Sequence, residues 1–250
     1  MISLIIPAFN EEEALRKMLP RLPELVAGQV VRPLLVSDGS TDGTVAVAIE
    51  HAIPVLAFSS NCGKGSAVRA ALDAVAPSGS DVVVVIDGDG QHLPEDIPRL
   101  VRPVLDGEAD IAVGSRYAAD EGRRNTPLNR YLVRTTTVAI LGHLLGRRFT
   151  DPYCGFRAFS ARILSDVRIC GERYEGELEA LFDATRCGLR IAEVPIERIY
   201  GPATSKMAAD GGRIIGRVRA IRQYALTIAR KRREMRDTVE VARRRVEEAA

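Results

Sequence analysis

Residues 82–92 read V-V-V-V-I-D-G-D-G-Q-H, an unbroken apolar run that is followed at once by two aspartates separated by a glycine. Five consecutive β-branched residues predict a strand covered on both faces, because a strand with one solvated face would alternate apolar and polar residues. The change to Asp and Gly marks the end of the strand. This stretch predicts a central strand of a parallel sheet with acidic side chains at its carboxyl end.

Similar apolar runs recur along the first half of the chain and alternate with helical patterns. Strands are expected at 2–7, 31–36, 55–58 and 111–113, in addition to 82–86. Alternation of strands with helices is typical of parallel strands joined by crossover helices. The first half therefore predicts a doubly wound, mostly parallel α/β sheet flanked by helices.

The helices between these strands have recognisable start signals. Asn10 is expected to cap a helix whose first turn contains Glu11, Glu12 and Glu13, since acidic residues complement the helix dipole. Ser40 or Thr41 is expected to cap a helix over residues 42–50 in the same way. Two further helices are expected, over 66–75 and from Pro94 to residue 105.

The second half of the chain has a different pattern. Helices are expected over 128–145 and over 174–187, with Gly188 ending the second one. Strands are expected over 156–159 and 189–196, and Pro195 indicates an edge position for the latter. From residue 212 a helical pattern runs to the C-terminus. We therefore expect a main domain over 1–211 and a helical extension over 212–250.

Composition and cysteine spacing exclude several classes of protein. The chain has 250 residues, of which 46% are hydrophobic, and this suits one α/β domain with an appendage. Its four cysteines form no C-x-x-C pair, which argues against a zinc site or a disulfide framework and suits a reducing cytoplasm. The N-terminus lacks the basic region of a signal peptide, and the uncharged stretch 135–146 is shorter than the roughly 20 residues that span a bilayer. We expect a cytoplasmic protein.

Positive charge is concentrated at the end of the chain. Residues 213–250 contain 12 Lys/Arg and 5 Asp/Glu, a net charge of +7, whereas the whole chain carries +2. This pattern is compatible with a solvated helix, with peripheral contact to the cytoplasmic face of an anionic membrane, or with a partner, including a homodimer. We expect the first half of the extension to pack on the main domain and the second half to meet solvent or a membrane. Nucleic-acid binding is not expected, because no aromatic stacking platform accompanies the basic residues.

The segment 86–92 carries the strongest chemical motif. Asp87 and Asp89 follow a predicted buried strand, and the glycines beside them permit close approach of the backbone to a ligand. Carboxylate and amide oxygens suit Mg²⁺ or Mn²⁺, so Gln91 would join the two aspartates while substrate phosphates complete the shell. Two aspartates alone would favour a solvated turn, and the surrounding motifs favour the metal site. His92 is expected behind the ligands or at the surface rather than on the metal.

Two further segments carry candidate ligand contacts. Asp38 directly follows a predicted strand and is expected to accept hydrogen bonds from a base or ribose. The stretch 61–65, N-C-G-K-G, precedes a helix, and Lys64 within it indicates an anion site. It lacks the spacing of a P-loop, and no G-x-G-x-x-G follows the first strand, which argues against a dinucleotide-binding dehydrogenase.

Taken together, the motifs resemble family 2 glycosyltransferases, which have the Rossmann-like GT-A fold of nucleotide-diphospho-sugar transferases. The matching segments of the first half are I-I-P-A-F-N-E-E (5–12), V-S-D-G-S-T-D-G-T (36–44), N-C-G-K-G-S-A (61–67), D-G-D-G-Q-H-L-P-E-D-I (87–97) and V-G-S-R-Y (113–117). Those of the second half are D-P-Y-C-G-F-R-A-F (151–159), E-L-E-A-L-F-D-A (177–184) and V-P-I-E-R-I-Y-G (194–201). Within the family, the chain is similar to dolichyl-phosphate mannose synthases and polyprenyl-phosphate glycosyltransferases.

The resemblance implies a role for each matching residue. It implies nucleotide-sugar binding for Pro7, Phe9, Glu11, Asp38, Lys64, Asp87 and Gly88, and metal binding for Asp87, Asp89 and Gln91. It implies catalysis for Asp89, Arg116 and Arg130, and binding of an acceptor phosphate for Arg116, Arg130, Arg198 and Lys206. The chain departs from its relatives in Phe9, where tyrosine is commoner, in Cys154, which we expect to be packed rather than nucleophilic, and in a longer stretch between Arg198 and Lys206.

The implied reaction is one in-line displacement that inverts the anomeric carbon. A hexose, mannose or glucose, would pass from a GDP- or UDP-sugar to a polyprenyl or dolichyl phosphate. An alcohol acceptor would need a base, for which Asp89 and Glu177 are the candidates. One alternative is a soluble transferase for a small acceptor such as a phosphoglycerate or a secondary metabolite, and another is a non-catalytic nucleotide-sugar-binding subunit. A nucleotidyltransferase is disfavoured because residues 7–11 form no glycine-rich, arginine-bearing loop.

Overall fold

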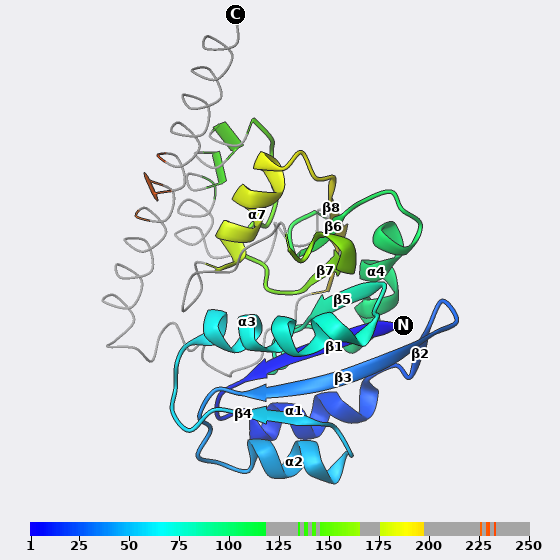
Figure 1. Ribbon diagram of the computed structural model, residues 1–250, viewed down its shortest axis with the longest axis vertical. Coiled ribbons are helices and arrows are strands. Elements are labelled where there is room, and N and C mark those ends of the chain that lie inside the picture. Colours follow the sequence, from blue (N-terminus) through cyan, green and yellow to red (C-terminus); the bar gives the residue numbers. More distant parts are fainter. Residues whose placement is uncertain are drawn as a thin grey trace, which may run out of the picture.

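The computed structural model describes three long parts of the chain, residues 1–118, 146–165 and 176–197 (Figure 1). It also describes isolated helical positions, which are Thr135, Val138, Ala139, Gly142, His143, Leu226, Ala229, Arg230 and Arg233. The helices predicted over 128–145 and from residue 212 onward therefore lie mostly outside the described residues.

The strands form one mixed sheet in the order β2-β3-β1-β5-β7-β6-β8, with β4 paired to β3. Their bounds are β1 (Ile2–Ala8), β2 (Leu25–Val26), β3 (Gln29–Ser37), β4 (Val55–Ala57), β5 (Val82–Val85), β6 (Ile111–Ser115), β7 (Arg157–Ser160) and β8 (Ile191–Pro195). The pairs β1–β3, β1–β5, β3–β4 and β6–β8 are parallel, whereas β7 runs antiparallel between β5 and β6. The prediction of a mostly parallel α/β sheet is confirmed.

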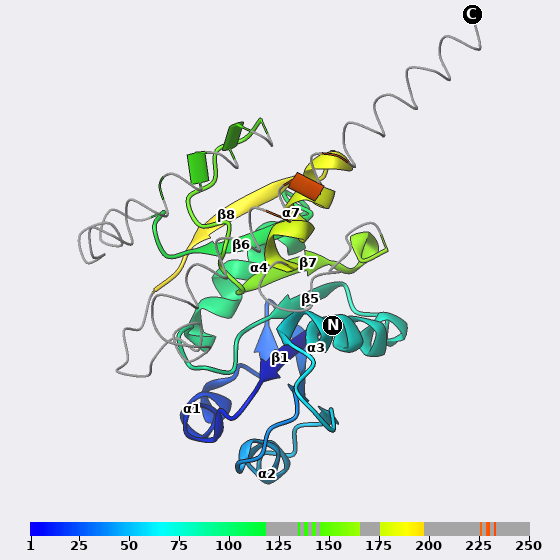
Figure 2. The ribbon, with the colours of Figure 1, turned by 90° about the vertical axis from the view of Figure 1, so that its left-hand side faces the viewer.

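Helices cover both faces of this sheet. They are α1 (Glu12–Met18), α2 (Thr44–Glu50), α3 (Lys64–Val75), α4 (Ile97–Leu105) and α7 (Gly176–Arg186), with short 3-10 turns η1 (Leu19–Arg21), η2 (Ala76–Ser78), η3 (Pro94–Asp96) and η4 (Ala161–Ile163). Helices α3 and α7 line one small cavity together with β5 and β7, so they share a face of the sheet. Helix α4 packs against β5, β6 and β7 from the opposite face (Figure 2).

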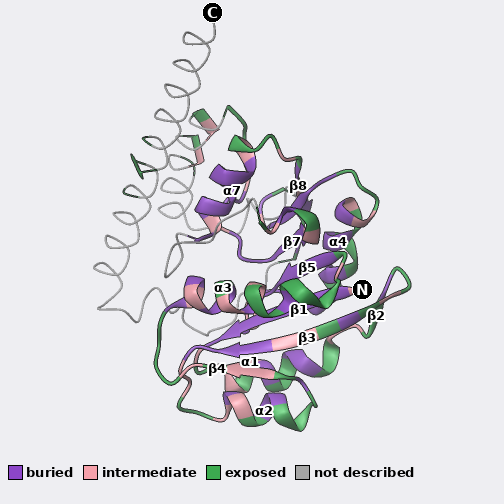
Figure 3. Ribbon diagram, in the orientation of Figure 1, coloured by how far each residue is buried: buried purple, intermediate pink, exposed green. Residues whose placement is uncertain are grey.

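The central strands are buried along their whole length (Figure 3). All residues of β1, β5 and β6 are buried, which confirms that continuous apolar runs marked strands covered on both faces. Each fully buried aliphatic side chain contributes about 1.5–3 kcal/mol of transfer free energy. This packing fixes the positions of the strand ends, from which the candidate site is built.

The predicted helix caps are wrong. Helix α1 begins at Glu12 without a side-chain cap, and Asn10 instead has φ 53° and accepts a hydrogen bond from the Thr41 N–H at 2.8 Å. Helix α2 begins at Thr44 rather than residue 42, and Asp42 Oδ1 accepts the Thr44 N–H at 3.0 Å. The physical reason is that the loops after β1 and β3 lie side by side, so Asn10 binds the Thr41 N–H across them and Asp42 Oδ2 accepts the Glu12 N–H at the start of α1 at 3.2 Å.

Several boundaries also differ from the predictions. A β2–β3 hairpin around Ala27 and Gly28, which have φ 49° and 76°, was missed because β2 is only two residues long. Helix α3 begins at Lys64, two residues before the predicted start. The end of α7 before Gly188, with φ 68°, is confirmed. Pro195 lies in β8 at the end of the described strand order, as expected for an edge strand.

Arg230 contacts helix α7 through an ion pair. Glu179 on α7 is fully buried, and Arg230 forms a salt bridge with its carboxylate. Eight of the eleven residues of α7 are buried, so this helix is covered on the side away from the sheet as well. Among the helices that the structure describes, none has both the length and the apolar character needed to cross a bilayer.

Candidate active site

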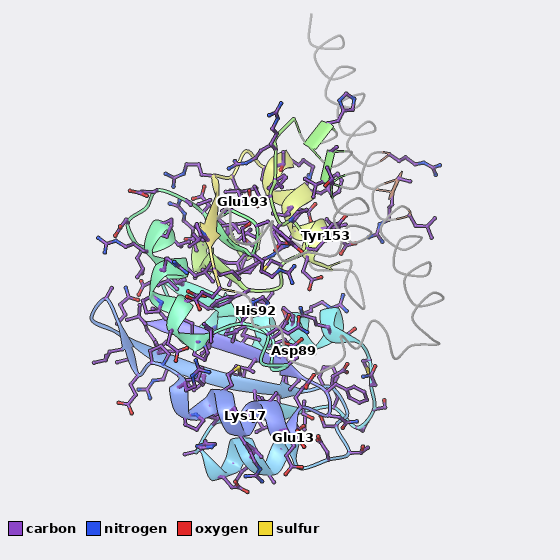
Figure 4. All side chains as sticks on the ribbon, turned by 180° about the vertical axis from the view of Figure 1, so that it is seen from behind. Glu13, Lys17, Asp89, His92, Tyr153 and Glu193 are labelled. Carbon is purple, nitrogen blue, oxygen red and sulfur yellow. The ribbon has the colours of Figure 1, made fainter. Side chains whose placement is uncertain are left out.

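The candidate site lies at the carboxyl ends of β1, β3, β5 and β6. Because β1 pairs in parallel with both β3 and β5, the segments that follow these three strands meet at one edge of the sheet. Those segments carry Phe9 and Glu11, Asp38, and Asp87 with Asp89. Arg116 follows β6 beyond the intervening β7. Figure 4 shows Asp89 and His92 on the turn after β5 and Glu193 on β8.

A partly buried ion-pair triangle occupies the centre of this edge. The Lys64 Nζ atom lies 2.6 Å from Asp87 Oδ1 and 2.7 Å from Glu177 Oε1. Burial by itself would lower the pKa of Lys64, but attraction to the two carboxylates outweighs it and raises that pKa. The lysine is therefore a fixed cation, supplied by the start of α3, that joins the turn after β5 to the first turn of α7.

The two aspartates of the motif have opposite electrostatic environments. Burial alone would raise the pKa of Asp87, but the nearby Lys64 charge outweighs it and lowers that pKa. Burial, followed by the charge of Asp87, raises the pKa of Asp89 to about 6. The Gln91 N–H donates to Asp89 Oδ1 at 3.0 Å, so the turn itself orients this carboxylate. Asp89 thus carries negative charge that the surrounding protein does not fully neutralise.

These residues fit a hard divalent cation. Asp87, Asp89 and Gln91 supply oxygen atoms from a single turn, and the crowding that raises the pKa of Asp89 is relieved by a cation. Within the described ranges, no group of three or more His, Cys, Asp or Glu side chains forms a complete metal cage. This donor set therefore suits a metal that shares its shell with substrate phosphates.

Gly155 makes room for the charged triangle. A Cβ atom at this position would clash with Lys64 Nζ and would lie 2.7 Å from Asp87 Oδ2. Our sequence interpretation gave Gly155 no role, although it lies in the D-P-Y-C-G-F segment. The sequence signal that could have indicated this role is a glycine within that segment, which lies over the acidic turn.

Asp38 is placed beside the site but is already engaged by the backbone. Its side chain is almost fully buried and accepts the Cys62 N–H at 2.7 Å and the Gly63 N–H at 2.9 Å. It therefore anchors the loop that leads to Lys64. Each carboxylate oxygen has a second lone pair, so a further contact to a base or ribose is compatible with this geometry.

The loop after β1 contacts both the loop after β3 and the acidic turn after β5. The Gly88 N–H donates to the Pro7 carbonyl at 3.1 Å, and a Cβ atom on Gly88 would lie 3.1 Å from that oxygen. The Glu11 N–H donates to Thr44 Oγ1 at 2.8 Å. The structure thus brings Pro7, Glu11 and Gly88 together with the acidic turn, while Phe9 is partly exposed beside them.

Arg116 is the one predicted phosphate-binding arginine that lies among the described residues. Its Nε and Nη2 atoms donate to Asp151 at 2.6 Å and 2.9 Å. Burial alone would lower the pKa of Arg116, but the Asp151 charge outweighs it, so this pKa is raised. Arg130, Arg198 and Lys206 lie outside the described residues.

Arg157 is a buried residue that the sequence interpretation missed. It is 2% exposed and donates to the carbonyls of Pro152 at 2.8 Å, Cys154 at 2.8 Å and Glu177 at 2.6 Å. It therefore holds the segment containing Gly155 against the first turn of α7. A lone arginine in a strand segment carried no recognisable signal, because all its partners are backbone atoms.

Two other residues behave as expected. Cys154 is fully buried, and burial raises the pKa of its thiol to about 12, so it is packed and is no nucleophile at neutral pH. His92 is 3% exposed and lies against Phe156 with ring centroids 5.4 Å apart. Burial lowers the pKa of His92 to about 4, so a neutral imidazole packs behind the acidic turn, and the alternative surface position is excluded.

The fold and the acidic strand ends define a nucleotide-sugar transferase of the GT-A class. The model of glycosyl transferase family 2 matches residues 3–168, and the chain belongs to this family. A polyprenol monophosphomannose synthase of Mycolicibacterium smegmatis is 34% identical over 83% of this chain and 81% of its own length. An undecaprenyl-phosphate mannosyltransferase of Micrococcus luteus is 34% identical over 85% of this chain and 88% of its own.

Solved structures are similar over most of the chain. The glucosyl-3-phosphoglycerate synthase of Mycobacterium tuberculosis, in complex with Mn²⁺, UDP-glucose and phosphoglyceric acid, superposes with a TM-score of 0.70 and 27% identity. The match covers 93% of this chain and 79% of that protein. This likeness confirms the GT-A fold that the sequence motifs implied.

Proposed function

We propose that the chain is a metal-dependent, inverting glycosyltransferase that moves a hexose from a GDP- or UDP-sugar to a polyprenyl monophosphate. The observation that carries this proposal is the pairing of an incompletely neutralised acidic turn at Asp87 and Asp89 with a separate, partly buried cation at Arg116 on the same sheet. The first suits a metal and a diphosphate, and the second suits an acceptor phosphate. Relatives named for polyprenol and undecaprenyl phosphates support the acceptor class.

Asp87, Asp89 and Gln91 would hold Mg²⁺ or Mn²⁺. When bound, the metal supplies charge stabilisation to the departing nucleoside diphosphate. Lys64 would add a fixed positive charge next to Asp87, and Pro7, Phe9, Glu11, Asp38 and Gly88 would line the nucleotide pocket. Arg130, Arg198 and Lys206 stay predicted members of the phosphate-binding set with Arg116, and Arg116, Arg130 and Asp89 stay the predicted catalytic residues.

The acceptor phosphate would act as its own nucleophile. A phosphate monoester has a second pKa of about 6, so one of its oxygens is an anion near neutral pH and needs little help from a base. Arg116 would orient it. Glu177 lies 2.7 Å from Lys64, which supports a role as partner of this lysine ahead of a role as base. For an alcohol acceptor, Asp89 and Glu177 stay the predicted base candidates.

A small phosphorylated acceptor is the second candidate substrate. It is favoured by the likeness to glucosyl-3-phosphoglycerate synthase, whose solved complex contains phosphoglyceric acid. Both acceptors share a phosphate monoester, so the described site suits either. The distinction depends on whether an apolar tail or a second polar group accompanies the phosphate.

The test is a transfer assay with labelled GDP-mannose, UDP-glucose and UDP-N-acetylglucosamine, each offered with undecaprenyl phosphate or with 3-phosphoglycerate, with and without Mn²⁺. We expect metal-dependent label in the butanol-extractable lipid and its loss in Asp87→Ala and Asp89→Ala. Asp106→Ala is the matched control, because Asp106 is an exposed aspartate that pairs only with Arg102 among the described residues. Label in the aqueous product alone would establish the second candidate, and no nucleotide binding by any donor would establish a non-catalytic subunit.

We further propose the division into a main domain over 1–211 and an extension over 212–250. The Arg230–Glu179 ion pair supports packing of the first half of the extension on α7. Peripheral membrane contact would then fall to the second half, at the cytoplasmic face. Flotation with vesicles containing anionic lipid tests the membrane contact, and light scattering after gel filtration tests for a homodimer.

A further inference from the structure

The buried Asp151 and the partly buried Arg116 form a pair in which the carboxylate binds two adjacent nitrogens of the guanidinium group. Asp151 Oδ2 accepts from Arg116 Nε at 2.6 Å and from the Arg116 backbone N–H at 3.2 Å, and Oδ1 accepts from Nη2 at 2.9 Å. Asp151 is 1% exposed. A paired carboxylate of this kind fixes the plane of the guanidinium group as well as its position.

A second carboxylate, that of Glu193, fixes the backbone of the loop that carries Asp151. Glu193 on β8 accepts the backbone N–H groups of Thr150, at 2.8 Å, and of Asp151, at 2.9 Å. The Thr150 hydroxyl also binds Ser115 Oγ at 2.6 Å, at the end of β6. The loop that carries Asp151 is thus tied to the two parallel strands β6 and β8, and Asp151 has little freedom to move.

This arrangement leaves one part of Arg116 for a ligand. The Nε and Nη2 atoms are taken by Asp151, whereas Nη1 makes no hydrogen bond to a described residue. The Arg116 side chain is 17% exposed, so a small part of it reaches solvent. An arginine held in this way offers its remaining donors in one direction, and the group that suits them is a phosphate oxygen.

We propose that Asp151 is a positioning residue, which orients Arg116 toward the phosphate monoester of the acceptor. The inference rests on the proposed function, because it assigns the acceptor phosphate to Arg116. Asp151 itself touches no substrate and acts through the guanidinium group. A loss of orientation by about 1 Å at such a contact lowers the rate roughly 100-fold.

The chain contains a matched control at the other end of the same strand. Asp110 directly precedes β6, as Arg116 directly follows it, and Asp110 accepts from Arg190 Nε at 3.2 Å, from Nη2 at 3.0 Å and from the Arg190 backbone N–H at 2.8 Å. Its carboxylate has the same three donors on one arginine, with Arg162 as a further donor, and is also buried. It lies at the amino end of β6, away from the candidate site.

The experiment compares Asp151→Asn with Asp110→Asn. Steady-state kinetics give KM for the acceptor, KM for the donor and kcat, and calorimetry gives the affinity for farnesyl monophosphate and, separately, for 3-phosphoglycerate. We expect Asp151→Asn to raise the acceptor KM and the Kd of the phosphate ester roughly 10- to 100-fold, with the donor KM within about twofold. Asp110→Asn should change melting temperature only.

A double-mutant cycle separates positioning from a general structural role. In an Arg116→Met background, Asp151→Asn should cause no further loss of phosphate-ester affinity, because the group it orients is absent. Equal losses in both backgrounds, or an unchanged acceptor KM in Asp151→Asn, would overturn the proposal. Should Asp151→Asn not fold, Glu193→Gln is the second variant, because Glu193 binds the backbone of the loop that carries Asp151. It should raise the acceptor KM to a smaller extent, and an unchanged acceptor KM in Glu193→Gln would also overturn the proposal.

The two readouts distinguish this inference from the proposed function. If the wild-type chain binds farnesyl monophosphate or 3-phosphoglycerate but transfers no sugar, the proposed function fails. The Kd values of wild type and Asp151→Asn for the phosphate ester still test whether Asp151 orients Arg116. If the wild-type chain transfers sugar and Asp151→Asn matches it in every constant, the inference fails alone. Preference for farnesyl monophosphate over 3-phosphoglycerate identifies a lipid as the source of the phosphate.

Discussion

Replacing Gly155 by alanine adds one methyl group directly against the charged centre of the site. The new Cβ atom would clash with Lys64 Nζ and lie 2.7 Å and 3.2 Å from the two Asp87 carboxylate oxygens. Ordinary contacts of carbon are about 3.5–4 Å, so the Lys64 and Asp87 side chains, or the backbone, must move by roughly 0.5–1 Å. The Lys64–Asp87 contact of 2.6 Å cannot persist unchanged under such a displacement.

The expected loss is much larger for activity than for stability. A displacement near 1 Å at a reacting centre costs roughly 100-fold in rate, or about 2.7 kcal/mol of transition-state stabilisation. Gly155 does not have a positive φ, so alanine also restricts the unfolded chain, which contributes about 0.4–1 kcal/mol in the stabilising direction. This gain partly offsets the weakened ion pairs, and we expect little change in melting temperature.

The assay measures kcat, the Kd of the Mn²⁺–nucleotide pair and the melting temperature for Gly155→Ala. Gly79→Ala serves as the control, because Gly79 has φ 70° and nothing within 4 Å of an added Cβ, so alanine there strains the backbone far from the site. It should lower the melting temperature and leave kcat unchanged. Wild-type kcat and nucleotide affinity in Gly155→Ala would refute the role assigned to this glycine.

Three further predictions follow from burial and charge. Because burial and then Asp87 raise the pKa of Asp89 from 3.8 to about 6, the folded state binds this proton more tightly than the unfolded state, and stability falls as pH rises through about 6. Without metal, Asp89→Asn should therefore be more stable than wild type at pH 7.5, by about 2–3 kcal/mol at most. Denaturant titrations measure this difference in the free energy of unfolding. The absence of a difference at pH 7.5, or a difference that persists below about pH 4, would contradict the prediction. Cys154, with its pKa raised to about 12, should resist iodoacetamide at pH 8 in the native protein while exposed Cys62 reacts, and peptide mass spectrometry checks this. Arg230→Ala should lower the free energy of unfolding by about 1–3 kcal/mol, because it removes a charge partner of the buried Glu179. An unchanged free energy of unfolding would contradict the packing of this segment on α7.

The central strands could be predicted from sequence because their signal is local. The run at 82–86 has no polar residue, and a chain segment of this kind is stable only where both faces are covered. The same reasoning located β1, β3 and β6. It could not locate β7 between β5 and β6, because strand order depends on pairing between segments far apart in the chain.

The helix starts were less predictable because polar side chains have competing partners. Asn10 has the side chain of a good cap, yet it binds Thr41 across the gap between two loops. A cap hydrogen bond and a loop–loop hydrogen bond have similar free energies, so the tertiary arrangement decides between them. Sequence spacing carries no information about that arrangement.

The sequence by itself determined the chemistry at the strand ends. Asp87, Asp89 and Lys64 could be named from their places after strands or before a helix, because parallel strands end at one edge of a sheet. Only the tertiary structure decided their partners. It joined Lys64 to Glu177, more than a hundred residues away, placed Gly155 over Asp87, and held Arg116 with Asp151. The physical reason is that ion pairs and close contacts depend on distance in space, which local sequence patterns do not encode.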